Sequence, residues 1–153
     1  MRRALKEAEK AGQNNEVPIG SVIVAKSGDI LASARNSTIS QCDPTAHAEM
    51  LVLRKASNYL GNYRLVGATI YTTIEPCLMC MGAIIHARLE RVVFGAHDPK
   101  WGGAGSLYNF ANDSRLNHRI ECVSGVLEDQ CRLLIQTFFR NRRLKGAVKA
   151  SRT

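Results

Sequence analysis

Two short segments, about 30 residues apart, carry residue types that bind transition metals. The first contains His47 and Glu49, and the second contains Cys77 and Cys80. A zinc ion held by three nitrogen or sulfur ligands keeps its fourth position for water, which is typical of a catalytic site, whereas four protein ligands close a structural site. The pattern therefore predicts a catalytic zinc site with His47, Cys77 and Cys80 as its ligands.

The acidic residue of this group, Glu49, is predicted to carry protons and not to bind the metal. Two thiolates already neutralise a divalent cation, which leaves the carboxylate free. Zinc lowers the pKa of bound water to about 7. Glu49 could take the proton of that water, pass it to a ring nitrogen and later protonate a departing amine. Cytosine, adenine and guanine all qualify as the ring.

Each half of the pattern also has a simpler interpretation. The Cys77–Cys80 pair alone could be a redox pair or half of a zinc ribbon, and His47 alone could be a buried core histidine. The two halves in this order, with Pro76 before the first cysteine, favour the catalytic metal site.

The elements expected around the ligands are helix starts. Cys77 and Cys80 are three residues apart, which on a helix places both sulfurs on one face, and Pro76 is suited to the first turn. The free N–H groups at a helix start favour anionic sulfur. His47 follows a capping segment, residues 43–45, and opens an apolar periodic run. Two helix starts are thus predicted to face one metal ion.

The rest of the chain alternates between helical and strand patterns. This alternation predicts an α/β fold, a three-layer α/β/α sandwich with a mixed sheet of about five strands. Strand, helix and strand in succession over residues 68–95 predict a parallel pair, and the last helix is expected to bury Leu127, Cys131, Leu134 and Phe138 on one face. The expected elements are helices over 2–14, 45–59, 77–88 and from about 127, strands over 17–25, 30–35, 68–74, 91–95 and 120–123, and a loop over 97–106.

Composition predicts a cytoplasmic protein with one domain over residues 1–153. The chain has no apolar run long enough to span a membrane, its first residues are not expected to form a signal peptide, and its five cysteines indicate no disulfide framework. Net charge is +8, and six basic residues with no acidic one lie between Arg140 and Thr153. This basic helix and tail, from about residue 127, could bind a polyanion or could simply be a solvated helix end.

Several motifs resemble those of the bacterial tRNA-specific adenosine deaminases, which belong to the cytidine and deoxycytidylate deaminase superfamily. The loop and tail motifs carry the resemblance best, because other deaminases share the zinc signature without them. The matching motifs are E-V-P-I-G at 16–20, D-P-T-A-H-A-E-M at 43–50, N-Y-R-L at 62–65, E-P-C-L-M-C at 75–80, R-V-V-F-G-A at 91–96, D-P-K-W-G-G-A-G-S-L at 98–107, N-H-R-I at 117–120 and F-F-R-N-R-R at 138–143.

The resemblance implies hydrolysis of the wobble adenosine, position 34, to inosine in a tRNA anticodon stem-loop. It also implies a cytidine deaminase-like fold, one Zn2+ per subunit and a homodimer. One departure is Gly103, where the family commonly has alanine.

Six substrate-binding residues follow from the same resemblance, and each also has a purely structural interpretation. Asn36 would hydrogen-bond the flipped base or merely end a strand. Asp98 and Lys100 would lie near the anticodon or merely set a loop turn. Asn117 would contact a base or form a turn, and Phe139 with Arg142 would pack on RNA, although Phe139 could belong to the core.

Two other functions stay open from the sequence. One is a deaminase of a free base or nucleotide, such as guanine, cytidine or deoxycytidylate. The other is a catalytically silent RNA-binding subunit stabilised by zinc, and the presence of Glu49 argues against it.

Overall fold

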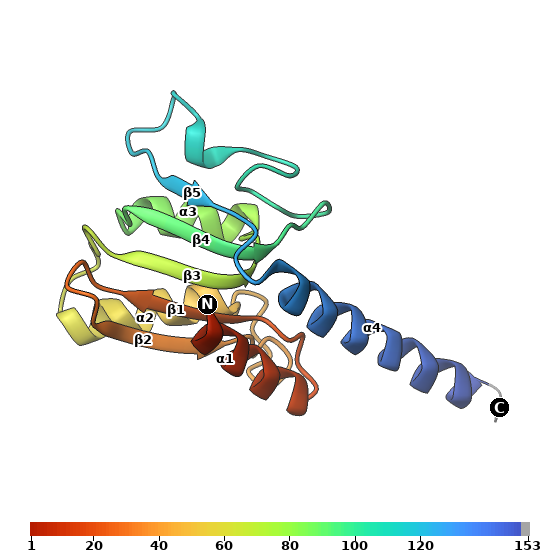
Figure 1. The fold of residues 1–153 in the computed structure, drawn as a ribbon. Coiled ribbons are helices and arrows are strands. Elements are labelled where there is room, and N and C mark those ends of the chain that lie inside the picture. Colours follow the sequence, from red (N-terminus) through yellow and green to blue (C-terminus); the bar gives the residue numbers. More distant parts are fainter. Residues whose placement is uncertain (151–153) are drawn as a thin grey trace.

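The chain folds around one mixed five-stranded sheet (Figure 1). The computed structural model describes residues 1–150, with side chains described up to Leu144. The strand order is β2-β1-β3-β4-β5. β1 pairs antiparallel with β2 and β3, whereas β3, β4 and β5 run parallel to one another. The strands are β1 (Gly20–Val24), β2 (Ile30–Arg35), β3 (Thr69–Ile74), β4 (Arg91–Ala96) and β5 (Glu121–Val123).

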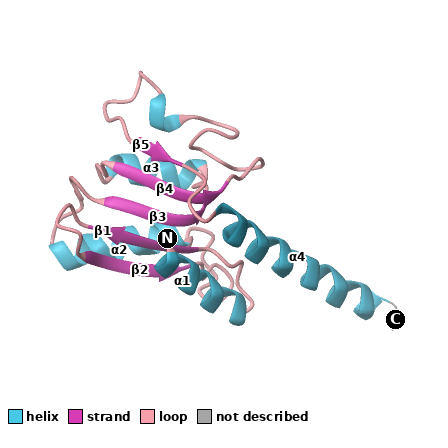
Figure 2. Cartoon of the chain, in the orientation of Figure 1, coloured by secondary structure: helices cyan, strands magenta, loops and turns pink. Residues whose placement is uncertain are grey.

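Helices cover both faces of this sheet (Figure 2). α2 (Ala48–Leu60) and α3 (Leu78–His86) pack on one face, and α1 (Arg2–Gln13) and α4 (Glu128–Ala150) pack on the other. A short 3-10 helix, η1 (Phe110–Asn112), lies in the connection before β5. The arrangement confirms the predicted three-layer α/β/α sandwich. No helix in the described part of the chain has both the length and the apolar character needed to cross a membrane.

The larger core lies between the sheet and the α2–α3 layer. Ile23, Ile70 and Phe94 of the sheet are buried against residues of α2 and α3 that include Val52 and Met81. The opposite layer has a smaller cluster of Leu5, Ala96 and Cys131. Burial of apolar area therefore fixes most firmly the two helices whose starts were predicted to hold the metal.

Two glycines let the other pair of helices approach the sheet closely. A Cβ atom at Gly20 of β1 would collide with the backbone of α1, at the Ala4 carbonyl oxygen and, 2.5 Å away, the Ala8 nitrogen. A Cβ atom at Gly95 of β4 would collide with the sulfur of Cys131 in α4. The strand thus meets the backbone of α1 at Gly20 and the side chain of Cys131 at Gly95, and both close approaches are possible only without a side chain on the strand.

The last helix departs from the sequence prediction. Cys131 is fully buried, but Leu134 and Phe138 are only half-buried, so the expected continuous buried face is wrong beyond the first turns. A 23-residue helix is about 35 Å long, whereas a six-residue strand covers about 20 Å. The later turns of α4 consequently extend past the sheet (Figure 1).

Candidate metal centre

The three predicted ligands come together at the starts of two neighbouring helices. His47 is the residue that precedes α2, Cys77 precedes α3, and Cys80 lies in the first turn of α3. The Nδ1 atom of His47 is 3.8 Å from the sulfur of Cys77 and 3.6 Å from the sulfur of Cys80. All three ligand atoms lie within 4.8 Å of one another. Residues 30 positions apart in the sequence thus form one cluster.

The geometry of this cluster fits zinc. A tetrahedral zinc ion with Zn–S of about 2.3 Å and Zn–N of about 2.0 Å places nitrogen and sulfur about 3.5 Å apart. Within the described residues, His47, Cys77 and Cys80 are the group of possible ligands, and no fourth side chain belongs to it. Two sulfurs and one imidazole nitrogen are therefore suited to hold zinc with one coordination position left for water.

The cluster also favours deprotonated sulfur. A hydrogen bond from Cys80 lowers the pKa of Cys77 to about 4, against the opposing effect of burial, and a hydrogen bond from His47 acts in the same direction. The pKa of Cys80 is raised by the hydrogen bond with Cys77 and by burial. The metal-free pair therefore carries one thiolate, and a cation that binds both sulfurs displaces the proton of Cys80.

Glu49 is buried in the first turn of α2, with 2% of its surface exposed. Its Oε1 accepts a hydrogen bond from the Thr72 hydroxyl at 3.2 Å, and that hydroxyl accepts one from Ser21 at 3.0 Å. Burial raises the pKa of Glu49 above its ordinary value, although hydrogen bonds, including that from Thr72, partly oppose this effect. A buried carboxylate of raised pKa beside a metal site is suited to take up and release a proton.

A second buried glutamate, Glu16, holds Asn36. The Nδ2 atom of Asn36 donates to Glu16 and to Thr38, at 3.3 Å in both cases. Glu16 also accepts the backbone N–H groups of Ile39 and Ser40. Burial alone would raise the pKa of Glu16, but the hydrogen bonds from Ser40, Ile39 and Thr38 lower it overall. Asn36 is thereby fixed at the end of β2.

Asn36 lies close to the metal ligand of α2. The backbone N–H of the next residue, Ser37, donates to the carbonyl oxygen of Ala46 at 3.0 Å, and Ala46 directly precedes His47. Asn36 is 4% exposed. The structure therefore brings this predicted base-binding residue to the edge of the metal centre.

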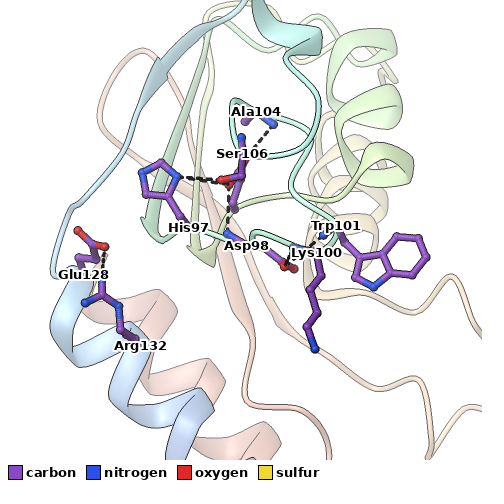
Figure 3. A network of polar contacts seen from close by, with 9 residues as sticks. His97, Asp98, Lys100, Trp101, Ala104, Ser106, Glu128 and Arg132 are labelled. Atoms are coloured by element: carbon purple, nitrogen blue, oxygen red, sulfur yellow. Dashed lines mark hydrogen bonds and ion pairs between the residues drawn. The ribbon is translucent and has the colours of Figure 1, made fainter.

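Four of the predicted RNA-contacting residues lie in the loop of residues 97–106 or in α4, and Asn117 lies apart from them. Lys100, Phe139 and Arg142, together with Arg143, line one open hollow of about 520 Å³ between the loop of residues 97–106 and α4. Asp98 lies in that loop and accepts the N–H groups of Lys100 and Trp101 (Figure 3). The structure thus joins a loop and a distant helix in one basic and aromatic surface.

Asn117 does not join either site. Its Oδ1 accepts a hydrogen bond from Arg88 at 3.0 Å, and Arg88 follows the end of α3. The ligand Cys77 precedes the start of that helix, which is about 13 Å long. Asn117 therefore lies at the far end of α3 from the ligands, and its predicted contact with a base remains a prediction.

Comparisons with known proteins agree with this chemistry. Residues 1–96 match the family model of the cytidine and deoxycytidylate deaminase zinc-binding region. A tRNA-specific adenosine deaminase of Bacillus subtilis (strain 168) is 50% identical over 145 residues, which are 95% of this chain and 89% of that protein. The chain belongs to the tRNA-specific adenosine deaminases.

Solved structures support the same family. One, from a study of A-to-I editing by tRNA:A34 deaminases at the wobble position of transfer RNA, has a TM-score of 0.84 and 42% identity, covering 88% of this chain and 96% of that chain. Another, a guanine deaminase from Nitrosomonas europaea, has a TM-score of 0.77 at 21% identity, covering 88% and 80%. The second likeness extends to the fold alone.

Sequence reasoning missed three residues of this chain: Glu16, Glu75 and Thr72. All three are buried and polar. Glu16 and Glu75 each lie two residues before a residue of special chemistry or shape, Pro18 and Cys77, inside motifs that carry the family resemblance. For Glu75, an acidic residue between the apolar Ile74 and Pro76 was the signal that could have identified it. Glu16, which follows Asn15, and Thr72 gave no comparable signal.

Proposed function

We propose that this protein is a zinc-dependent hydrolase that converts the wobble adenosine, position 34, of a tRNA anticodon to inosine with release of ammonia. The observation that carries the proposal is the cluster of His47, Cys77 and Cys80 beside the buried Glu49. The 50% identity to a tRNA-specific adenosine deaminase selects the substrate class.

Zinc held by His47, Cys77 and Cys80 would supply a water molecule of lowered pKa as the nucleophile for C6 of adenine. Glu49 takes the proton from this water and gives it to the ring nitrogen next to C6. The carboxylate then moves a second proton, from the hydroxyl now on C6, to the departing amine, which leaves as ammonia while C6 becomes a carbonyl carbon. The burial that raises the pKa of Glu49 helps it to hold each proton between these steps.

The substrate is a looped-out base, because an adenine stacked in a helix could not reach Glu49. Asn36, held by Glu16 at the edge of the site, is assigned to the flipped base. The hollow formed by Lys100, Phe139 and Arg142 is assigned to the anticodon stem-loop, with the cations on phosphates and the aromatic ring available for stacking. We also assign one zinc ion to each subunit of a homodimer, and a cytoplasmic location where tRNA is present.

The test is the variant Glu49→Ala, assayed for inosine on an anticodon stem-loop with adenosine at position 34. We expect zinc content and RNA affinity to stay at the wild-type level while the rate falls by about 10²-fold or more, because the proton carrier is lost. Cys77→Ser, in contrast, should lose zinc in metal analysis, since only two of three ligands remain. Glu9→Ala, which removes an exposed carboxylate of α1, is the control with unchanged activity.

The same assay separates the alternatives. Inosine formation by Glu49→Ala at the wild-type rate would show that the proton carrier is another residue. A wild-type protein that deaminates free guanine or cytidine and leaves the stem-loop unchanged would be a free-base or nucleotide deaminase. A wild-type protein that binds the stem-loop and zinc but forms no product would be a silent RNA-binding subunit.

A further inference from the structure

A fully buried glutamate, Glu75, joins the segment of the cysteine ligands to the loop of residues 97–106. It follows β3, lies two residues before Cys77 and is 1% exposed. Its carboxylate accepts hydrogen bonds from donors that all come from this loop, and Figure 3 labels the donor residues Asp98, Ala104 and Ser106. These donors are the N–H groups of Asp98 at 3.1 Å, Ala104 at 2.9 Å and Ser106 at 3.0 Å, and the hydroxyl of Ser106.

The loop is shaped to fit this carboxylate. A Cβ atom at Gly102 would lie 2.5 Å from the carboxylate of Glu75 and 2.5 Å from the carbonyl oxygen of Asp98. The N–H of Gly103 donates to the carbonyl oxygen of Pro76 at 2.8 Å. The loop backbone therefore wraps the Glu75 side chain and is also tied to the residue that follows it.

His97 closes the network at the start of the loop. Its Nδ1 atom lies 3.2 Å from the Ser106 hydroxyl and 3.4 Å from the carboxylate of Glu75 (Figure 3). Its ring packs edge-on against Phe94, with centroids 5.1 Å apart. Both ends of the loop are thus held at Glu75, although they are nine residues apart in the sequence.

We propose that Glu75 is a positioning residue for the RNA substrate. By fixing the loop, its carboxylate sets where Asp98 and Lys100 meet the anticodon relative to the metal centre. This inference rests on the proposed function, because it assigns a role within RNA recognition. None of the four hydrogen bonds that Glu75 accepts comes from the His47–Cys77–Cys80 cluster, so the role concerns substrate placement and not metal binding.

Only a carboxylate satisfies the donors that surround this position. Two oxygens without hydrogen accept three N–H groups and a hydroxyl at once. Glutamine has nearly the same shape, but its NH2 group would face the N–H of Asp98 or those of Ala104 and Ser106. At least one buried N–H then loses its acceptor, and the loop must move to recover it.

The experiment compares Glu75→Gln with Gly102→Ala, which disturbs the same contact from the loop side, and with Glu9→Gln as an exposed control. Each protein is measured for zinc content, for hydrogen exchange of the loop amides, and for kcat and KM on the anticodon stem-loop. For Glu75→Gln and Gly102→Ala we expect wild-type zinc content, faster exchange at Asp98, Ala104 and Ser106, and a KM raised about 10- to 100-fold with a smaller change in kcat. The double variant should resemble each single one, because both changes disrupt the same contact between Glu75 and the loop.

The remaining outcomes decide against the proposal. Wild-type exchange and KM in both variants, loss of zinc, or a fall in kcat with unchanged KM would each overturn it. If Glu75→Gln does not fold, Gly102→Ala and Ser106→Ala decide, and the loss of one hydroxyl should raise KM about 2- to 10-fold. If the wild-type protein forms no inosine, the proposed function fails. Faster loop exchange without any change in RNA affinity or KM overturns the role of Glu75 alone.

Discussion

Three buried glutamates have pKa values shifted in different directions because their surroundings differ. Glu49 accepts a side-chain hydrogen bond from Thr72, and burial raises its pKa. Glu16 and Glu75 are equally buried, but several hydrogen-bond donors surround each carboxylate and lower its pKa overall. Burial therefore dominates the pKa shift of Glu49, whereas hydrogen-bond donors outweigh burial at Glu16 and Glu75, which stay ionised and hold loops.

The lowered pKa of Glu16 predicts a pH dependence of stability. Its folded-state pKa lies below the ordinary value of 4.5, so its contribution is fully present above about pH 4.5 and is lost as the pH falls through the folded-state value. Glu16→Gln should lower the free energy of unfolding by about 1–3 kcal/mol at pH 7, and this difference from wild type should shrink below about pH 4.5.

Chemical denaturation of both proteins between about pH 3 and pH 7 measures the effect of Glu16, because the predicted loss lies below pH 4.5. Protonation of the metal ligands affects both proteins alike and cancels in the difference. A gap that stays constant through this range would show that Glu16 does not act through its charge. Glu9→Gln, on the exposed side of α1, should show no gap.

Among the elements, α1 is held against the sheet by close backbone contact at Gly20. Gly20→Ala should lower the free energy of unfolding by about 1–3 kcal/mol, because the added methyl group meets backbone atoms of Ala4 and Ala8 that cannot turn away. Gly82→Ala in α3 is the matched control, since no atom lies within 4 Å of its added methyl group, and a helix interior favours alanine by about 1 kcal/mol.

Thermal unfolding of the zinc-loaded proteins compares the two glycine variants. Equal stability of Gly20→Ala and wild type would mean that α1 is not seated as described. Destabilisation by Gly82→Ala would mean that α3 is more crowded than the structure shows.

The sequence predicted the elements well because their signals are local. Apolar periodicity and β-branched runs identified the five strands and the four long helices, and the helix starts at His47 and Cys77 followed from capping and spacing. Some boundaries shifted: the strand expected from Val17 begins at Gly20, after Pro18, which has no N–H to donate to a sheet. The burial of α4 was not predictable, because it depends on where the neighbouring strands end.

The metal ligands of the site were predictable from the sequence, but the buried residues that hold the surrounding loops were not. Ligand types and spacing suffice to find His47, Cys77 and Cys80, because the metal imposes them. The contacts of Glu16 and Glu75 with distant loops depend on tertiary structure, and nothing in the local sequence states which backbone N–H groups will surround them. The meeting of Lys100 with Arg142 likewise depends on how a loop and a helix cross.

At the scale of the whole molecule, charge is distributed to suit an RNA partner. The net charge is +8, and Arg140, Arg142 and Arg143 lie in the later turns of α4. Figure 1 shows that this helix extends past the sheet. The predicted basic tail is described only in part, because the side chains from Lys145 onward and all of residues 151–153 lie outside the described structure. The described arginines alone already give the helix a cationic surface.

This distribution predicts the salt dependence of RNA binding. Each phosphate neutralised on a single strand contributes about −0.7 to the slope of log K against log salt concentration. Arg142→Ala combined with Arg143→Ala should reduce the magnitude of that slope by about 1 to 1.5. Lys26→Ala with Arg64→Ala removes the same charge near the turn of the β1–β2 hairpin and beyond the end of α2, far from the ligands, and should leave the slope unchanged.

Fluorescence anisotropy of a labelled anticodon stem-loop between about 50 and 200 mM salt measures these slopes. Equal slopes for both double variants would mean that binding depends on net charge alone. The hollow between the loop and α4 would then have no special part in holding phosphate.

The place of β1 between β2 and β3 bears on how the protein folds. His47 follows the β2 side of the sheet and the two cysteines follow β3, whereas β1 is the strand that pairs with both. In a newly made chain, before β1 has paired with β2 and β3, the histidine and the two cysteines would form two separate half-sites for a cation. We expect zinc binding during refolding to lag behind recovery of the strand signal in circular dichroism. An ion bound earlier, from a trace supply, would be held by an incompletely folded chain. Stable zinc binding would then report that the sheet has formed completely.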